Sequence, residues 1–132
     1  MDYALGRALT KRGAVFNIFN VKFPDRNKSK YCIVMEDYVD GMINIPVIFN
    51  THRMEFIYQP SSVKVKDGTI KGISGETLIQ CENWCLMSPD IFLDRKKSRY
   101  LCQLPLDIMK EVNDALTYIR DIDEVTLIRM LE

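Results

Sequence analysis

Apolar and polar residues alternate in short blocks over most of this chain. Residues 14–23 interleave apolar side chains with Asn17, Asn20 and Lys22, a pattern typical of a bulged or curved strand rather than a helix. Turn residues separate further short apolar runs, which predict strands at residues 31–35, 43–49, 54–58, 62–65, 77–81 and 100–104. Many short strands of this kind favour a small closed or strongly bent barrel.

The hydrophobic period changes near the C-terminus. After Pro105, the residues Leu106, Met109, Leu116 and Ile119 recur at a helical spacing, and a second helical stretch follows over residues 122–131. Residues 1–11 predict a short helical turn, and residues 24–30 predict a polar loop. We therefore expect a mainly β fold with a C-terminal helix (α+β). It forms one domain over residues 1–132, with a barrel over about 12–104 and a helical part over about 105–131.

The charge distribution permits a nucleic-acid surface without requiring one. The chain has zero net charge, yet residues 1–104 hold 15 Lys and Arg against 11 Asp and Glu, while residues 105–132 hold 3 against 7. A surface that binds phosphate non-specifically usually has a larger excess of cations. Ordinary solvated charge explains the basic body and the acidic end equally well.

Several protein classes are disfavoured by the composition. No apolar stretch approaches the roughly 20 residues that span a bilayer, and the N-terminus has no secretory pattern. We therefore expect a cytoplasmic protein that does not bind a membrane. Its four cysteines are interpreted as buried free thiols rather than disulfides. A zinc site is disfavoured because Cys81 and Cys85 lie far along the chain from His52, the one histidine. No metal or other cofactor is expected.

Polar and cationic residues stand at the ends of neighbouring predicted strands. Lys30 precedes the strand at 31–35, whereas Thr51, His52 and Arg53 follow the strand at 43–49. Strands of one sheet could deliver these side chains to one rim, where they would hold a phosphate. No acidic pair, metal cluster or glycine-rich phosphate loop accompanies them in the sequence. The chemistry predicted here therefore uses cations and hydroxyls without a metal.

The order and spacing of four stretches resemble the MazF/PemK family of toxin ribonucleases. They are Arg-Gly-Ala-Val-Phe at 12–16, Lys-Ser-Lys-Tyr-Cys-Ile-Val-Met at 28–35, Asn-Thr-His at 50–52, and the pair 77–81 and 101–116. The resemblance implies the SH3-like barrel that this family shares with the gyrase-poison toxins. This chain departs from the family pattern at Lys30 and Tyr31, where the family typically has arginine followed by proline.

The resemblance also implies a function and a set of site residues. It implies the toxin of a type II toxin–antitoxin system, a homodimer that cleaves single-stranded RNA without a metal and is inhibited by a cognate antitoxin protein. Lys30 would be the cation on the phosphate, and Thr51 would orient or hydrogen-bond the phosphate. Histidine is the residue type whose ordinary pKa lies near neutrality, so His52 is the predicted acid or base.

Six further residues are candidates for RNA contact. The segment 94–99 concentrates four cations in six residues, and the sole tryptophan could stack on a base. The predicted RNA-binding residues are Lys28, Arg53, Trp84, Arg95, Lys96 and Lys97. Solvated surface charge and a core tryptophan are the plain alternatives. At the level of function, the alternatives are a gyrase-poison-like toxin and a catalytically degenerate barrel that binds a protein or a nucleic acid.

Overall fold

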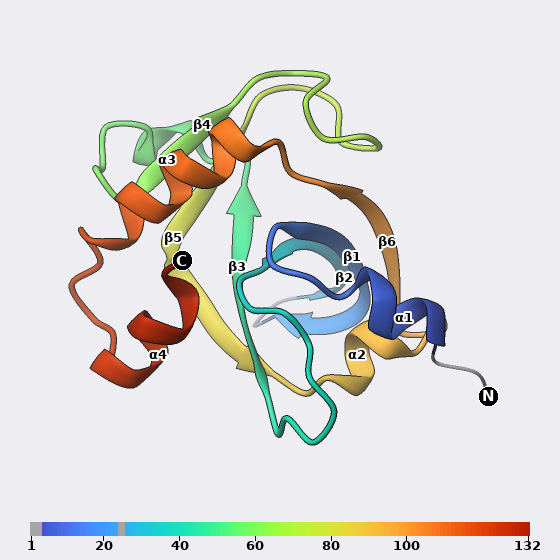
Figure 1. Ribbon diagram of the computed structural model, residues 1–132. Helices are drawn as coiled ribbons and strands as arrows, with labels where there is room; N and C mark the ends of the chain where they lie inside the picture. The colour runs from blue at the N-terminus through green and yellow to red at the C-terminus, as the bar shows by residue number, and fades with distance from the viewer. Residues whose placement is uncertain (1–3, 24–25) are drawn as a thin grey trace.

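The computed structural model describes residues 4–23 and 26–132, with residues 20–23 and 26–29 described as backbone only (Figure 1). None of the helices in this described part is long and apolar enough to cross a bilayer. The elements, in chain order, are α1 (Ala4–Leu9), β1 (Ala14–Phe23), β2 (Arg26–Val34), β3 (Ile45–Thr51), the 3-10 helix η1 (Met54–Phe56), β4 (Ser62–Val65), β5 (Thr77–Met87), α2 (Asp90–Leu93), β6 (Ser98–Gln103), α3 (Leu106–Leu116) and α4 (Glu124–Met130).

The strands form one antiparallel sheet in the order β4-β5-β3-β2-β1-β6. Figure 1 shows this sheet strongly curved, with α3 and α4 beside β3 and β5. Register shifts interrupt the pairing of β1 with both of its neighbours and of β3 with β5, and such bulges increase the local twist that bends a sheet. The predicted mainly β fold with C-terminal helices is confirmed.

Both faces of the sheet are covered, which explains why its strands are apolar in nearly continuous runs. Side chains alternate between the faces along a strand. Val15, Ile33 and Ile48 belong to the core that α3 and α4 cover, whereas their neighbours in sequence belong to a second core closed by Phe92 of α2. The buried neighbours in this second core include Phe16, Cys32, Val34, Val47 and Phe49.

Gly13, in the predicted opening motif, occupies a backbone position that only glycine fits. Its φ is 91°, and a Cβ there would lie 2.3 Å from Nε2 of Gln103. Its N–H donates to the carbonyl of Val34, and its own carbonyl accepts from the N–H of Leu104. The glycine thus joins the start of β1 to the end of β2 and to the chain that leads into α3.

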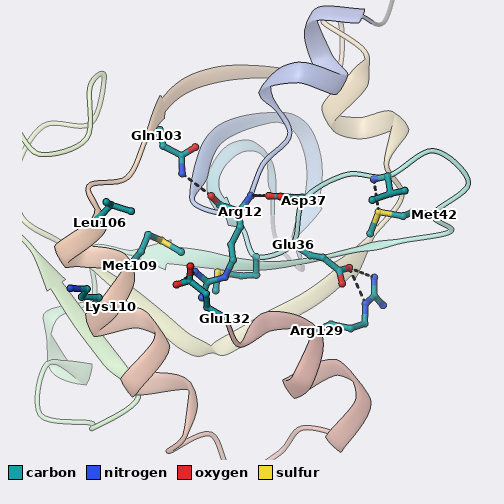
Figure 2. A pocket seen from close by; sticks show the side chains of 12 residues that line it. Arg12, Glu36, Asp37, Met42, Gln103, Leu106, Met109, Lys110, Arg129 and Glu132 are labelled. Atoms are coloured by element: carbon teal, nitrogen blue, oxygen red, sulfur yellow. Dashed lines mark hydrogen bonds and ion pairs between the residues drawn. The ribbon is translucent and has the colours of Figure 1, made fainter.

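Two arginines hold the C-terminal segment against the sheet (Figure 2). Arg129 of α4 donates to Oε1 of Glu36 at 2.9 and 3.0 Å, and to the side-chain and main-chain oxygens of Asn44 at 2.8 and 2.9 Å. Arg12 donates to the carbonyl of Met130 at 3.1 and 3.2 Å. The planar guanidinium makes several directed bonds at once, so these contacts define where α4 lies.

Two of the predicted segments are wrong. The polar loop expected at 24–30 is strand β2 from Arg26 onward, because Arg26, Asn27 and Lys28 pair with the end of β1; Pro24 and Asp25 lie outside the described residues. The strand expected at 54–58 is instead the helix η1 and a turn. β3 and β4 flank the same strand, β5, so the chain between them must cross from one side of β5 to the other. A short apolar run does not distinguish a strand from such a turn.

We predict that Arg129→Lys lowers the free energy of unfolding by about 1–2 kcal/mol, because lysine cannot keep the forked bonds to Glu36 and Asn44. Urea unfolding followed by circular dichroism measures the loss. Arg95→Lys, the same change at an exposed position, is the control. Equal stabilities of the two variants would contradict the role assigned to Arg129.

Candidate functional site

A cleft of about 370 Å³ opens at the end of β3, between β2 and β5. Two cationic side chains, a hydroxyl, an aromatic ring, three amides and one carboxylate meet in it. The lining residues are Lys30, Thr51, Arg53, Phe56, Gln59, Gln80, Glu82 and Asn83. Lys30 and Thr51, the two residues on which the sequence prediction depended, therefore lie in the same cleft.

The antiparallel register of β2 and β3 explains why Lys30 and Thr51 meet. Cys32 pairs with Phe49, and Lys30 and Thr51 each lie two residues beyond that pair. Side chains two positions apart share a face of a strand, so both residues project from the face that carries Phe49. The apolar part of that face is the second core, and the polar cleft continues it toward solvent.

Lys30 is a partly desolvated cation. It is half-buried, and its Nζ lies 4.9 Å from the centroid of the Phe49 ring, within the range of a cation–π interaction. Burial lowers the pKa of Lys30, while the nearby Cys85 thiol acts in the opposite direction. An ammonium in this setting is less strongly hydrated than a surface lysine, so it is better placed to bind an anion or to release a proton.

Thr51 and Arg53 are linked at the end of β3. The Oγ1 of Thr51 accepts a hydrogen bond from the backbone N–H of Arg53 at 3.1 Å, which leaves the hydroxyl proton for another acceptor. The guanidinium of Arg53 is ion-paired with Glu55 and lies 5.2 Å from the centroid of the Phe56 ring. A phosphate in the cleft would thus meet a hydroxyl donor and a cation from the same short segment.

A large bulge in β5 brings the remaining residues into the cleft. Ile48 pairs with Trp84 and Asn50 with Ile79, so the single β3 residue between these pairs faces four residues of β5, at positions 80–83. Bulges of this kind redirect side chains and are common beside functional sites.

Five of the lining residues were not predicted from the sequence: Phe56, Gln59, Gln80, Glu82 and Asn83. One signal for them existed. Gln80 is a polar residue between Ile79 and Cys81 in an apolar strand, and it is only 7% exposed. A buried polar side chain generally needs hydrogen-bond partners, so it points to a polar site nearby.

His52 does not line this cleft. It is exposed, and its Nδ1 lies 3.1 Å from the carbonyl oxygen of Glu76. His52 lies between two cleft residues in sequence, and alternation along the extended chain directs its ring to the other side. The residue predicted as acid or base is therefore separated from Lys30 and Thr51.

Trp84 contributes to a neighbouring hollow. This hollow, of about 590 Å³, is lined by Glu82, Trp84, Arg120 and Asp121, and Glu82 also lines the cleft. The indole N–H of Trp84 donates to the carbonyl of Asp121 at 3.2 Å, and its ring packs on the core beneath α3. The tryptophan thus holds the segment between α3 and α4 and is not a free stacking platform in the cleft.

The predicted basic run forms the turn between α2 and β6, outside the cleft. Lys97 is ion-paired with Asp90, and Arg95 lines a separate hollow beside α1. Ile18 of β1 pairs with Lys30 on one side and with Ser98 on the other, so Arg95, Lys96 and Lys97 lie near the same level of the sheet as the cleft. Lys28 pairs with Val21, and its side chain lies outside the described part.

All four cysteines are free thiols in the structure. Burial raises the pKa of Cys81 to about 12 and raises the pKa of Cys85, which keeps both thiols protonated near neutral pH. Among the residues that the structure describes, no three His, Cys, Asp or Glu side chains form a group that could hold a metal ion.

A larger cavity, of about 940 Å³, lies elsewhere, between the β2–β3 connection, α3 and the C-terminus (Figure 2). Its charged side chains pair mainly with one another: Arg12 with Glu132, and Arg129 with Glu36. Desolvation lowers the pKa of Arg12, and the nearby Glu132 and Asp37 carboxylates oppose that shift. These charges hold α4 in place, so the cavity is the weaker candidate for a functional site.

The fold, one strongly curved antiparallel sheet with C-terminal helices, matches that of a MazF-type toxin structure. No model of a known protein family matches the sequence, and no curated protein matches it. The chain is similar to a solved structure of an endoribonuclease in complex with its cognate antitoxin from a mycobacterial species, with a TM-score of 0.55 and 14% identity, over 81% of this chain and 90% of the other. The predicted resemblance is confirmed at the level of the fold.

We predict that the amine of Lys30 titrates at a lower pH in the folded protein than in the urea-unfolded chain, because burial disfavours its charged form. Pulse acylation across a pH series, read by peptide mass spectrometry, compares the labelling midpoints of Lys30 in the two states. Equal midpoints, or a higher midpoint in the folded protein, would show that the ammonium is not desolvated.

Proposed function

We propose that this protein is the toxin of a toxin–antitoxin pair and that it cleaves single-stranded RNA in the cleft between β2, β3 and β5. The observation that carries the proposal is the convergence of Lys30, Thr51 and Arg53 on one cleft. It is supported by a fold similar to that of a known endoribonuclease. A hydroxyl donor and two cations suit a phosphodiester better than a neutral ligand.

The reaction that these residues suit is attack of the ribose 2′-oxygen on the adjacent phosphorus. The new bond joins the 2′-oxygen to phosphorus, and the bond from phosphorus to the 5′-oxygen breaks. The hydroxyl of Thr51 and the guanidinium of Arg53 hold the non-bridging oxygens and balance the negative charge that develops on them. Lys30 also lies against the phosphate. Its lowered pKa makes it a better proton donor to the departing 5′-oxygen than Arg53, the other cation of the cleft.

Glu82 is the proposed general base. It is the carboxylate that the β5 bulge directs into the cleft, and Arg120 lies 3.4 Å from its Oε1. A carboxylate within reach of the 2′-hydroxyl can accept the proton that this group loses as it attacks. This assignment replaces His52, whose ring lies outside the cleft lining.

The proposed partners follow from the same similarity. The similar endoribonuclease was solved with its cognate antitoxin, so we infer that a cognate antitoxin protein inhibits this chain as well. A homodimer in the cytoplasm is part of the same proposal. It would place two clefts on one particle.

We predict that Lys30→Ala and Thr51→Ala each lower the rate of RNA cleavage by about 100-fold or more, because the first removes the proton donor to the 5′-oxygen and the second a hydrogen bond to the charged phosphate oxygens. The measurement is the rate of cleavage of a long single-stranded RNA by purified protein in the presence of a chelator. Thr51→Ser keeps the hydroxyl and should stay within about 10-fold of the original rate, while Lys66→Ala, an exposed site, is the control for Lys30. If the original protein leaves the RNA intact, the enzymatic proposal is wrong.

We also predict that Glu82→Gln reduces cleavage by about 100-fold or more with little change in RNA affinity, because the amide keeps the shape of the side chain but cannot take up the proton. Single-turnover rates and binding of a non-cleavable oligonucleotide separate these two effects. Glu76→Gln removes an exposed carboxylate that is ion-paired with Lys64 and serves as the control. An unchanged rate for Glu82→Gln would exclude this residue as the base.

A further inference from the structure

The floor of the cleft holds two glutamine side chains whose orientations are determined by their hydrogen bonds. The backbone N–H of Glu82 donates to Oε1 of Gln80 at 2.9 Å. A backbone N–H can only donate, so it identifies that atom of Gln80 as the oxygen. The other end of the same amide is therefore its NH₂ group, which donates to Oε1 of Gln59.

This chain of bonds determines what Gln59 presents to a ligand. Its oxygen is engaged by Gln80, which is only 7% exposed and held by the β5 bulge. Its Nε2 carries two N–H donors. Among the backbone groups and side chains that the structure describes, none accepts a hydrogen bond from this nitrogen, and the half-buried Gln59 lines the cleft. The group offered to a ligand is thus mainly a donor, next to an oxygen that already accepts one hydrogen bond.

A planar platform lies beside this donor. The ring of Phe56 and the guanidinium of Arg53, 5.2 Å from the ring centroid, line the same cleft. Aromatic rings are surfaces on which proteins stack unpaired bases, so the ring of Phe56 is the platform, while Arg53 remains with the phosphate. A nucleotide with its phosphate at Lys30 and Thr51 would place its base between this platform and Gln59.

We propose that this cleft selects a base with a keto group, guanine or uracil, next to the cleaved phosphate, and that Gln59 reads the keto oxygen. The inference rests on the proposed function for the cleavage step. O6 of guanine and O4 of uracil are acceptors, whereas adenine and cytosine carry amino donors at those positions. An unrestrained glutamine pairs with adenine through both its oxygen and its nitrogen. Here Gln80 already uses one of the two lone pairs of the oxygen and directs it toward β5, so the oxygen is a poorer partner for the adenine amino group than that of an unrestrained glutamine.

The first test maps cleavage sites. Purified protein digests a random-sequence RNA library, and sequencing of the cut ends gives the base frequencies around each cut. We expect guanine and uracil to exceed adenine and cytosine by roughly tenfold at one position, the discrimination typical of one well-formed base contact. Cleavage without a keto preference at any position would overturn the inference and leave the nuclease proposal standing.

Substitution at Gln59 provides the sharper test. In Gln59→Glu, one carboxylate oxygen can still accept from Gln80, and the other replaces the NH₂ group that faces the cleft. This second oxygen is an acceptor, so the base preference should shift to adenine and cytosine, which carry amino donors. Asn83→Asp places the same negative charge on the rim of the same cleft and should weaken binding without reversing the preference. Circular dichroism confirms that both variants fold. A reversal in both variants, or in neither, would overturn the role of Gln59.

A binding arm keeps the inference separate from catalysis. Fluorescence anisotropy compares 2′-O-methyl pentanucleotides that differ only in the central base, since these cannot react through the 2′-oxygen. Tighter binding of the guanine and uracil oligonucleotides, lost or reversed in Gln59→Glu, supports the inference. If the protein shows this binding but never cleaves RNA, the lack of cleavage contradicts the nuclease proposal alone. Equal binding of all four oligonucleotides by the original protein contradicts the base-reading role.

Discussion

The pairing of β3 with its two neighbours is the constraint on which the proposed site depends. The β2–β3 register places Lys30 and Thr51 on one face at one end of the sheet. On the other side of β3, four residues of β5 lie opposite the single residue Phe49. In a regular ladder one residue of β5 would face each residue of β3. Gln80 and Glu82 would then pair with residues of β3 other than Phe49. The bulge therefore determines which groups of β5 share the cleft with Lys30 and Thr51.

The rest of the structure supports this arrangement by burying both faces of the sheet. Apolar side chains of β1, β2 and β3 alternate between two cores. A register shift of one residue would move each set of side chains into the other core, so the packing of both cores fixes the register. Arg12 and Arg129 then hold the C-terminal segment across one end. Their charges are engaged in these contacts, which hold α4 in place.

The lysine at position 30 gives the site a different character from one built on arginine. An arginine would offer a planar fork to two phosphate oxygens, whereas lysine offers a compact charge whose pKa responds to burial. Lys30 lies over Phe49, and its pKa is lowered. In the proposed reaction, this lysine would exchange some precision in holding the phosphate for a cation that can also give up a proton, while Thr51 and Arg53 would supply directed donors.

The sequence by itself determined the fold class and pointed to Lys30 and Thr51, the two residues that meet in the cleft. Hydrophobic alternation marked β1 and β4, the helical period marked α3 and α4, and the strand ends marked Lys30 and Thr51, because these signals are local. Only the tertiary structure decided that His52 faces away, that Trp84 braces the C-terminal segment, and that Gln59, Gln80 and Glu82 complete the cleft. Those outcomes depend on a bulge and on hydrogen bonds between segments distant in sequence, which local patterns do not encode.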